Sequence, residues 1–361
     1  MLCRDMGLRD LLRPRYDGAL RAVVGGIVDR LRDGSPPLPL DESDRLDGRT
    51  CLVTGANRGL GLAIATDLVR RGAHVILACR SGIPGVLEVV RRRAGGPGTV
   101  EAMKLDLGSL DAVERFVDEL AEDGARVDVV VLNAGVVPRS ARRTGDGFDE
   151  GFQVNFLADT LLVMRLLERG VIPNTTFDPT DDGAIDADDL PDERRRARIV
   201  AVSSESHRSA PSIAFDRLGA FRPWAIREAM REYALSKLLL ETWCAELARR
   251  LGRGADVDVS VHTACPGAVH TDLAREAPSI VKPALEATMR RFFKPPAEGA
   301  HPFVHLAARR ALEGRTGLYA HVNRMTRRDP RAEDATNGRR LWDATARLLR
   351  DAGHPIGGEA R

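Results

Sequence analysis

A glycine-rich segment between two short apolar runs constrains the fold of this chain more than any other feature. Residues 50–53 read as a buried strand, 54–61 (TGANRGLG) as a loop, 62–71 as a helix closed by Gly72, and 73–78 as a second strand. Glycines at this spacing let the backbone turn sharply and bring the helix N-terminus against a pyrophosphate, whose charge the N–H groups and helix dipole favour. The segment therefore predicts a dinucleotide-binding α/β fold.

The rest of the chain alternates strand-like and helix-like segments without internal repeats. This pattern is typical of a doubly wound parallel sheet of the Rossmann type. A length of 361 residues with 43% hydrophobic content allows one large α/β domain with appendages. We expect an N-terminal extension over residues 1–48, the catalytic domain over 49–330 and a C-terminal helical tail over 331–361.

The residue after the second strand indicates which dinucleotide is bound. Sites for NAD usually place an acid there, whereas this chain has Cys79-Arg80. Arg58 in the glycine loop adds a second guanidinium, which suits a phosphate. We predict NADP(H), the alternative being that both arginines belong to an arginine-rich surface. The predicted contacts here are Gly55, Asn57, Arg58, Gly59, Leu60, Gly61 and Arg80.

A tyrosine and a lysine form the candidate chemical centre. Lys237 is one of four lysines in an arginine-rich chain and follows Tyr233 by four residues, so both share a face of the helix predicted there. A cation about 4 Å away lowers a phenol's pKa by roughly three units, which would make Tyr233 a usable acid or base. Alone, such a pair also fits an ordinary surface contact, so the interpretation depends on the cofactor site.

The glycine spacing T-G-x-x-x-G-x-G together with Y-x-x-S-K resembles the short-chain dehydrogenase/reductase family. Further matches follow in the family's order between residues 50 and about 330. They are Asp106-Leu107, similar to the adenine contact; Asn133-Ala134-Gly135, similar to the motif after the fourth strand; Asn155, similar to the helix asparagine; Ser204, aligned with the catalytic serine; and Pro266, Gly267, Val269 and Thr271 in the loop that holds the nicotinamide carboxamide.

The resemblance implies a role for each of these residues. Tyr233 would exchange the proton, and Ser204 would hydrogen-bond the substrate oxygen, with Ser203 as the alternative serine. Lys237 would lower the phenol pKa and hold the nicotinamide ribose, while Asn155 would relay protons to Lys237 through water. The alternative from another functional class is an NADP(H)-binding scaffold or redox sensor without turnover.

Peripheral strings resemble the retinol-dehydrogenase-like branch, which includes WW-domain oxidoreductases and protochlorophyllide reductases. The likeness implies lipophilic alcohols, aldehydes or ketones as substrates. A member of the extended type would normally show G-x-x-G-x-x-G, which this loop lacks. Glu205, directly after the serine, and an acidic insertion depart from the branch. The strings are residues 77–80, 105–110, 296–300, 317–319 and 340–342.

Net charge and cysteine usage narrow the partners and the compartment. A net charge of +2 argues against nucleic acid, and five cysteines without metal-type spacing indicate reduced thiols in a cytosol-like compartment. We predict no metal site, because residues 178–189 match a calcium loop only in part and read better as a solvated loop.

Three segments stand outside the alternating scheme. An apolar stripe near residues 20–31 fits packing on the domain or on a second subunit, as in a homodimer, and also fits peripheral membrane contact; both stay open. The acidic insertion covers about 174–198. Segments 205–232 and 272–296 frame the catalytic helix, and their aromatic residues either contact a bulky apolar substrate or pack among themselves.

Overall fold

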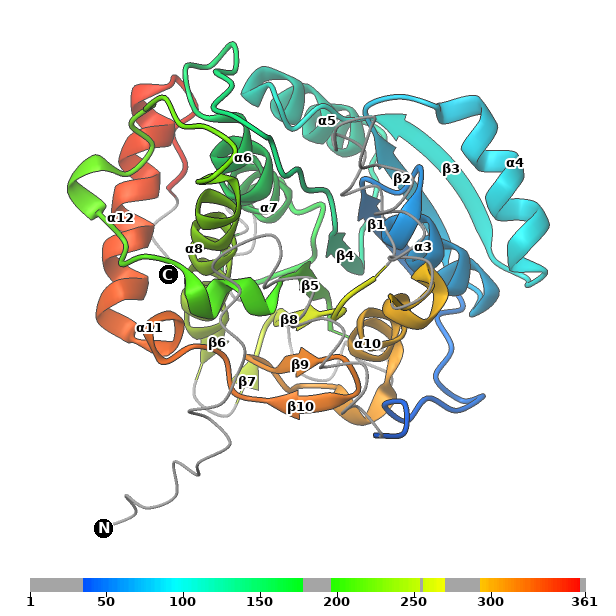
Figure 1. Ribbon diagram of the computed structural model, residues 1–361. Coiled ribbons are helices and arrows are strands. Elements are labelled where there is room, and N and C mark those ends of the chain that lie inside the picture. Colours follow the sequence, from blue (N-terminus) through cyan, green and yellow to red (C-terminus); the bar gives the residue numbers. More distant parts are fainter. Residues whose placement is uncertain (1–34, 178–195, 254–255, 270–292, 358–361) are drawn as a thin grey trace, which may run out of the picture.

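An eight-stranded sheet forms the centre of the protein in this computed structural model (Figure 1), which describes residues 35–177, 196–253, 256–269 and 293–357. Its spatial order is β10-β9-β8-β5-β4-β1-β2-β3. The strands are β1 Thr50–Thr54, β2 His74–Cys79, β3 Thr99–Lys104, β4 Val129–Leu132, β5 Arg198–Val202, β8 Ser260–Cys265, β9 Tyr319–His321 and β10 Arg324–Thr326, with a separate small pair of β6 Gly252–Arg253 and β7 Asp256–Val257.

The pairing confirms the predicted doubly wound sheet with one difference at its edge. In the large sheet, all neighbouring strands pair in parallel except β10, which pairs with β9 antiparallel. The difference arises because only Val322 and Asn323 separate β9 from β10, and so short a connection can join only antiparallel strands. Val322 takes the left-handed conformation there, with φ of 53°.

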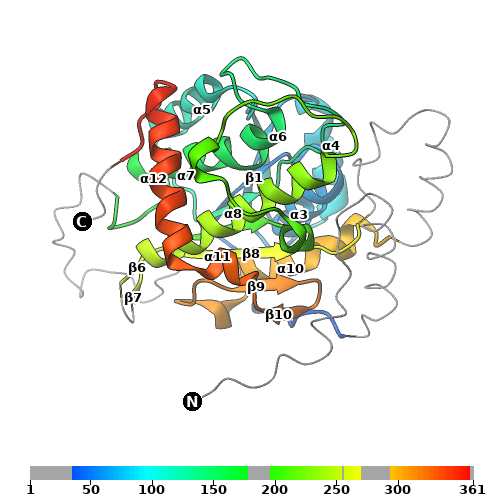
Figure 2. The same ribbon diagram turned by 60° about the vertical axis from the view of Figure 1, so that its left-hand side comes forward.

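Two helical layers cover the two faces of the sheet (Figures 1 and 2). Successive residues of a strand face opposite layers, so Cys51 and Val53 belong to one apolar cluster and Leu52 to the other. One layer consists of α3 Gly59–Arg70, α4 Ile83–Ala94 and α10 Pro296–Ala308. The other consists of α5 Leu110–Glu122, α6 Glu150–Phe152, α7 Ala158–Glu168 and α8 Ala229–Arg250.

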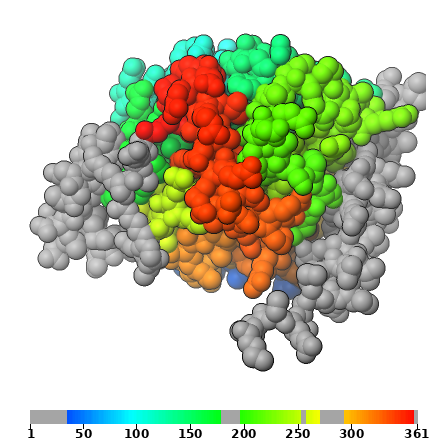
Figure 3. All heavy atoms as spheres, turned by 90° about the vertical axis from the view of Figure 1, so that its left-hand side faces the viewer, coloured from blue at the N-terminus to red at the C-terminus, as the bar shows by residue number. Residues whose placement is uncertain are grey.

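The helix α12, Ala335–Asp351, packs against α8 from outside the sheet (Figure 3, red). Trp342 stacks on Trp243 of α8 with ring centroids 6.3 Å apart, and the guanidinium of Arg250 lies 4.0 Å from the centroid of the Trp342 ring. The predicted C-terminal tail therefore packs on the core of the domain, and the described residues form a single domain. The predicted boundaries at residues 48 and 330 remain predictions.

Three of the predicted features cannot be compared with the structure. The stripe near residues 20–31, the core of the acidic insertion and most of the segment 272–296 lie outside the described residues. Among the described residues, no helix combines the length and apolar character needed to cross a bilayer.

One buried histidine in the central sheet makes stability depend on pH. His262 in β8 is fully buried, and neither ring nitrogen has a hydrogen-bond partner among the described residues. Burial lowers the pKa of His262 from 6.5 to about 3, and the nearby Arg198 and Arg328 add to this effect. Between pH 6.5 and about pH 3, the unfolded chain therefore binds more protons than the folded chain. The free energy of unfolding falls as the pH falls through this range.

We expect His262 to lower the free energy of unfolding by about 1.4 kcal/mol for each pH unit as the pH falls from 6.5 toward 3. Urea unfolding at pH 6.5 and at about pH 5 should show a smaller loss for His262→Leu than for the wild type. His74→Gln, which removes a half-exposed histidine, should keep the wild-type loss. Equal losses in the wild type and His262→Leu would contradict the prediction.

Candidate active site

The site lies where the strand order reverses, between the carboxyl ends of β1 and β4. Chains leaving adjacent strands on opposite sides open a crevice at such a point, and ligands of doubly wound sheets bind there. In this protein, hydrogen bonds of Thr54 join the loop that follows β1 to the loop that follows β4. Its Oγ1 accepts hydrogen bonds from the backbone N of Asn133 (2.9 Å) and of Ala134 (3.0 Å). Asn133 Nδ2 in turn donates to the Thr54 carbonyl oxygen (2.8 Å).

The glycine loop has the shape and polarity that a pyrophosphate requires. Gly55 adopts a left-handed φ of 64°, and a Cβ on Gly61 would lie 2.4 Å from Asn133 Nδ2 and 2.6 Å from the Gly55 carbonyl oxygen. Helix α3 begins at Gly59 with no side-chain cap at Arg58 and no acidic residue in its first turn. Its N-terminal N–H groups therefore point toward a position suited to an anion, with Leu60 buried behind them.

The glycine loop, which bears Arg58, also contacts the end of β2, after which Arg80 follows. Asn57 Nδ2 donates to the carbonyl oxygen of Ser81 (3.1 Å), the residue after Arg80. Arg58 and Arg80 are both exposed. The hydrogen bond thus brings the loop bearing one arginine against the segment bearing the other.

Two predicted adenine contacts follow β3. Asp106 Oδ1 accepts from the backbone N of Gly108 (2.9 Å), which shapes the turn before α5, and Leu107 is buried.

The predicted catalytic side chains come together from β5 and α8. Lys237 Nζ lies 5.9 Å from the ring centroid of Tyr233 and donates to the Val202 carbonyl oxygen (2.8 Å) at the end of β5. The next residues of the chain are the two serines. Ser204 hydrogen-bonds the Tyr233 phenol, whereas the buried Oγ of Ser203 has no hydrogen-bond partner among the described residues. The geometry therefore favours Ser204 over Ser203.

Asn155 joins this group from a π-helical turn, Gln153–Leu157. Its Oδ1 accepts from the Val136 backbone N (2.7 Å), and its Nδ2 donates to the Val136 carbonyl oxygen (2.9 Å) and to Ser236 Oγ (3.1 Å). A Cβ on Gly135 would lie 3.4 Å from Asn155 Oδ1 and 3.9 Å from Lys237 Nζ. Asn155, Gly135 and Lys237 thus surround one position. Single π-helical turns occur often at functional sites.

Burial governs the protonation of both members of the pair. It raises the pKa of Tyr233 to about 12, against which the Ser204 hydrogen bond acts. It lowers the pKa of Lys237, against which the carboxylates of Asp159 and Glu241 act. The side chains that act on the phenol are Ser204 and Cys265 and not Lys237, so the predicted lowering of the Tyr233 pKa by Lys237 is not seen here. A phenol with this pKa keeps its proton at neutral pH.

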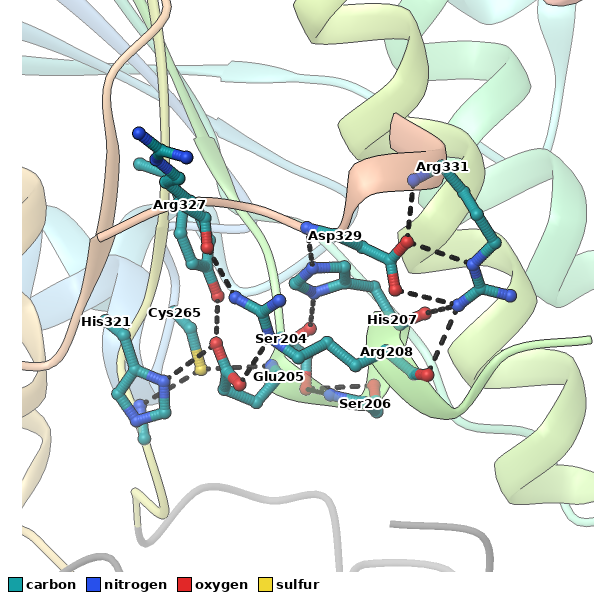
Figure 4. A network of polar contacts seen from close by, with 12 residues as sticks. Ser204, Glu205, Ser206, His207, Arg208, Cys265, His321, Arg327, Asp329 and Arg331 are labelled. Carbon is teal, nitrogen blue, oxygen red and sulfur yellow. Dashed lines mark hydrogen bonds and ion pairs between the residues drawn. The ribbon is translucent and has the colours of Figure 1, made fainter. Parts of the chain in front are cut away.

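Glu205, the charged residue after Ser204, is engaged by the C-terminal hairpin (Figure 4). Its Oε1 accepts from the Tyr319 hydroxyl (2.7 Å) and lies 2.9 Å from His321 Nδ1, and its Oε2 accepts from Arg208 Nε (2.9 Å). Burial would raise the pKa of Glu205, but His321, Arg208 and Tyr319 together hold it well below its usual range. The carboxylate is therefore satisfied within the protein.

The same turn is linked to the predicted carboxamide loop. Cys265 Sγ accepts from the backbone N of Glu205 (3.2 Å) and of Gly267 (3.4 Å). Gly267, after Pro266, has a left-handed φ of 74°. Val269 is buried, and a Cβ on Gly299 would lie 2.4 Å from its Cγ2, so this loop packs closely on α10. Thr271 lies outside the described residues.

Three aromatic residues before Tyr233 already have partners within the protein. The guanidinium of Arg340 lies 4.1 Å from the ring centroid of Phe215, and that of Arg143 lies 4.7 Å from that of Phe221. Trp224 Nε1 donates to Asp149 Oδ2 (3.0 Å). These contacts favour packing of the segment on other parts of the protein over direct contact with substrate.

Four residues of the site were not predicted from the sequence. Thr54, Ser206 and Cys265 act through hydrogen bonds to the loops, and Ser206 Oγ donates to Ser204 Oγ (3.0 Å). Asp159, buried in α7, faces Lys237 electrostatically. Its sequence signal was an acid within the otherwise largely apolar stretch 156–164. Thr54 is the threonine of the T-G-x-x-x-G-x-G motif, while Ser206 and Cys265 had no signal beyond lying near a motif.

Comparisons with known proteins agree with this geometry. The family model described as short chain dehydrogenase matches residues 49–172. Retinol dehydrogenase 14 of Homo sapiens is 34% identical over 352 residues, covering 90% of this chain and 91% of its own length. The chain belongs to the short-chain dehydrogenase/reductase family. This short-chain dehydrogenase also resembles human retinol dehydrogenase 13 (32% identity, covering 92% of this chain and 93% of the relative).

Solved structures show the same architecture. A crystal structure of an uncharacterised protein from Mycobacterium paratuberculosis matches this short-chain dehydrogenase with a TM-score of 0.60 and 28% identity, covering 87% of this chain and 97% of that chain. A structure described as an NAD(P)-dependent gluconate 5-dehydrogenase from Beutenbergia cavernae, with NADP bound at low occupancy, matches with a TM-score of 0.51 and 27% identity, covering 78% and 97%. The predicted family, its retinol-dehydrogenase-like branch and oxidoreductase activity are thereby supported.

We expect Gly61→Ala to abolish dinucleotide binding, because its Cβ would overlap Asn133 Nδ2 and the Gly55 carbonyl oxygen. The matched control is Gly85→Ala in α4, where no atom lies within 4 Å of the added Cβ. Fluorescence titration with NADPH measures both variants. Wild-type affinity in a folded Gly61→Ala protein would contradict the assignment of the glycine loop.

Proposed function

We propose that this protein is an NADP(H)-dependent oxidoreductase that transfers hydride between the nicotinamide and a lipophilic alcohol, aldehyde or ketone. The observation that carries the proposal is the convergence of Ser204, Tyr233, Lys237 and Asn155 beside the glycine loop. A bound nicotinamide would supply or accept the hydride; the protein's own residues handle the oxygen and its proton.

The hydroxyls of Ser204 and Tyr233 suit the oxygen at which charge develops. During carbonyl reduction, hydride adds to carbon, and the oxygen gains negative charge that two hydroxyl donors stabilise. Tyr233 then gives its proton to that oxygen. Its pKa, raised to about 12 by burial, ensures that the proton is present at neutral pH. Ser206 donates to Ser204 Oγ, which leaves the Ser204 proton for the tyrosine or the substrate oxygen.

Lys237 and Asn155 would restore the proton of Tyr233 and hold the ribose. The Lys237 ammonium has three donors, and one of them is used by Val202. The others suit ribose hydroxyls and a water. Asn155 fixes the loop after Gly135 through both of its side-chain atoms, which keeps space open beside Lys237.

The preference for NADP(H) rests on charge. Arg80 replaces the acid that ribose hydroxyls would need, and Asn57 holds the loop with Arg58 against the same strand end. The solved relative from Beutenbergia cavernae carries NADP, which agrees with this reading. The lipophilic substrate class rests on the likeness to relatives named retinol dehydrogenases. Glu205 does not oppose an apolar substrate, because its charge is already paired.

Tyr233→Phe should lower kcat for NADPH-dependent aldehyde reduction by at least about a hundredfold, since it removes the proton donor. NADPH affinity should change by less than about threefold. The assay follows NADPH absorbance with retinaldehyde and a medium-chain aldehyde. Tyr319→Phe, which removes a phenol engaged by Glu205, is the matched control and should keep most of kcat. Full turnover by Tyr233→Phe would contradict the mechanism.

Arg80→Asp should reverse the cofactor preference by placing a carboxylate where we propose the 2′-phosphate. Thermal shifts with NADPH and NADH at matched concentrations report it, because ligand at a hundred times its dissociation constant stabilises by about 2.7 kcal/mol. Arg92→Asp, on the exposed side of α4, is the control. An unchanged ratio would exclude Arg80 from the phosphate site. Stabilisation by NADPH without turnover of any carbonyl would favour the alternative, a cofactor-binding scaffold or redox sensor.

A further inference from the structure

A buried carboxyl group interacts electrostatically with the lysine of the site. Asp159 is 1% exposed and lies on α7, one helical turn after Asn155 and so on the same helix face. Among the described residues, its Oδ1 is buried without a hydrogen-bond partner, and Lys237 is the charged group that acts on it. A buried carboxyl without a partner is costly, so its presence here calls for a function.

The groups around the buried Lys237 ammonium show which carboxylate can balance its charge. The groups that act on its ammonium are Asp159 from α7, Glu241 and the Cys244 thiol from its own helix, and the Cys265 thiol at the end of β8. Glu241 shares its charge with a second cation, since its Oε2 accepts from Thr263 Oγ1 (2.9 Å) and pairs with Arg328 Nε (3.2 Å), while its Oε1 is buried without a hydrogen-bond partner among the described residues. Of the two carboxylates, Asp159 acts more strongly on Lys237, and Lys237 is the one charged group in the described part of the chain that acts on Asp159.

The protonation of the two groups is linked. Burial lowers the pKa of Lys237, so an ammonium with no counter-charge would lose its proton more readily. Burial raises the pKa of Asp159 to about 7, and Lys237 acts against this shift. The carboxylate, and with it the support for the ammonium, is therefore present above about pH 7 and is lost below it.

We propose that Asp159 is a positioning residue for the reaction, whose carboxylate keeps the buried Lys237 charged and in place beside Tyr233. This inference rests on the proposed function, in which the Lys237 ammonium serves the tyrosine and the ribose. It adds a fifth polar side chain to the set of Asn155, Ser204, Tyr233 and Lys237.

The first test compares Asp159→Asn with the wild type in pH profiles of kcat/KM for aldehyde reduction between about pH 6 and 10.5. In Asp159→Asn, the alkaline limb of the profile should move to lower pH by at least about one unit, because the ammonium loses its proton at lower pH. At a fixed alkaline pH this corresponds to a roughly tenfold larger loss of kcat/KM. The control is Thr160→Val. It removes a neighbouring buried hydroxyl that also has no hydrogen-bond partner among the described residues, but no charge. A shift in Asp159→Asn with none in Thr160→Val supports the proposal; superimposed wild-type and Asp159→Asn profiles overturn it.

A second measurement needs neither turnover nor a folded Asp159→Asn protein. Wild type labelled with ¹³C-aspartate should show one carboxyl that titrates near pH 7, and Lys237→Met should move that titration to higher pH. Titration of every aspartate below about pH 5, or no response to Lys237→Met, would overturn the inference. A wild type that binds NADPH but reduces no carbonyl would instead refute the proposed function, and the ¹³C titration would still decide the role of Asp159.

Discussion

The hydrogen bonds of one threonine hydroxyl fix the relation between the two halves of the fold. Thr54 ends β1, and its side chain accepts the first two N–H groups of the loop that leaves β4. Because the helices that follow these strands lie on opposite faces, the loops would otherwise separate. Asn133 returns the contact through its amide and occupies the space that a side chain at Gly61 would fill. The proposed dinucleotide site and the proposed catalytic group are therefore joined through these hydrogen bonds.

Much of this arrangement could be predicted because its signals are local. The spacing of glycines within 54–61 and the four-residue interval between Tyr233 and Lys237 determine local backbone geometry, which a sequence displays directly. The layers follow equally well from the alternation of strand-like and helix-like segments along the chain. Strands β9 and β10 were harder, since three residues each give no periodicity to read.

The partners of the buried charged side chains could not be predicted from the sequence. Glu205 stood out in the sequence only as a charged departure from the retinol-dehydrogenase-like branch, and its partners Tyr319 and His321 come from a hairpin more than a hundred residues later. Asp159 lies in an apolar helix whose partner face is set only when α7 and α8 pack. Such pairings depend on the tertiary fold, so the sequence shows the ionisable group but not the side chain that neutralises it.

The contact between α12 and α8 has a consequence for assembly. Helix α8 carries Tyr233 and Lys237 near its start and Trp243 further along, and Trp342 covers Trp243 from the same chain. A flat aromatic surface of this kind on an exposed helix would favour self-association. Here the polypeptide supplies the covering helix itself, so another copy could pair through this part of α8 only by displacing α12. Helix α12 thus keeps the buried Trp243 ring out of reach of any other protein.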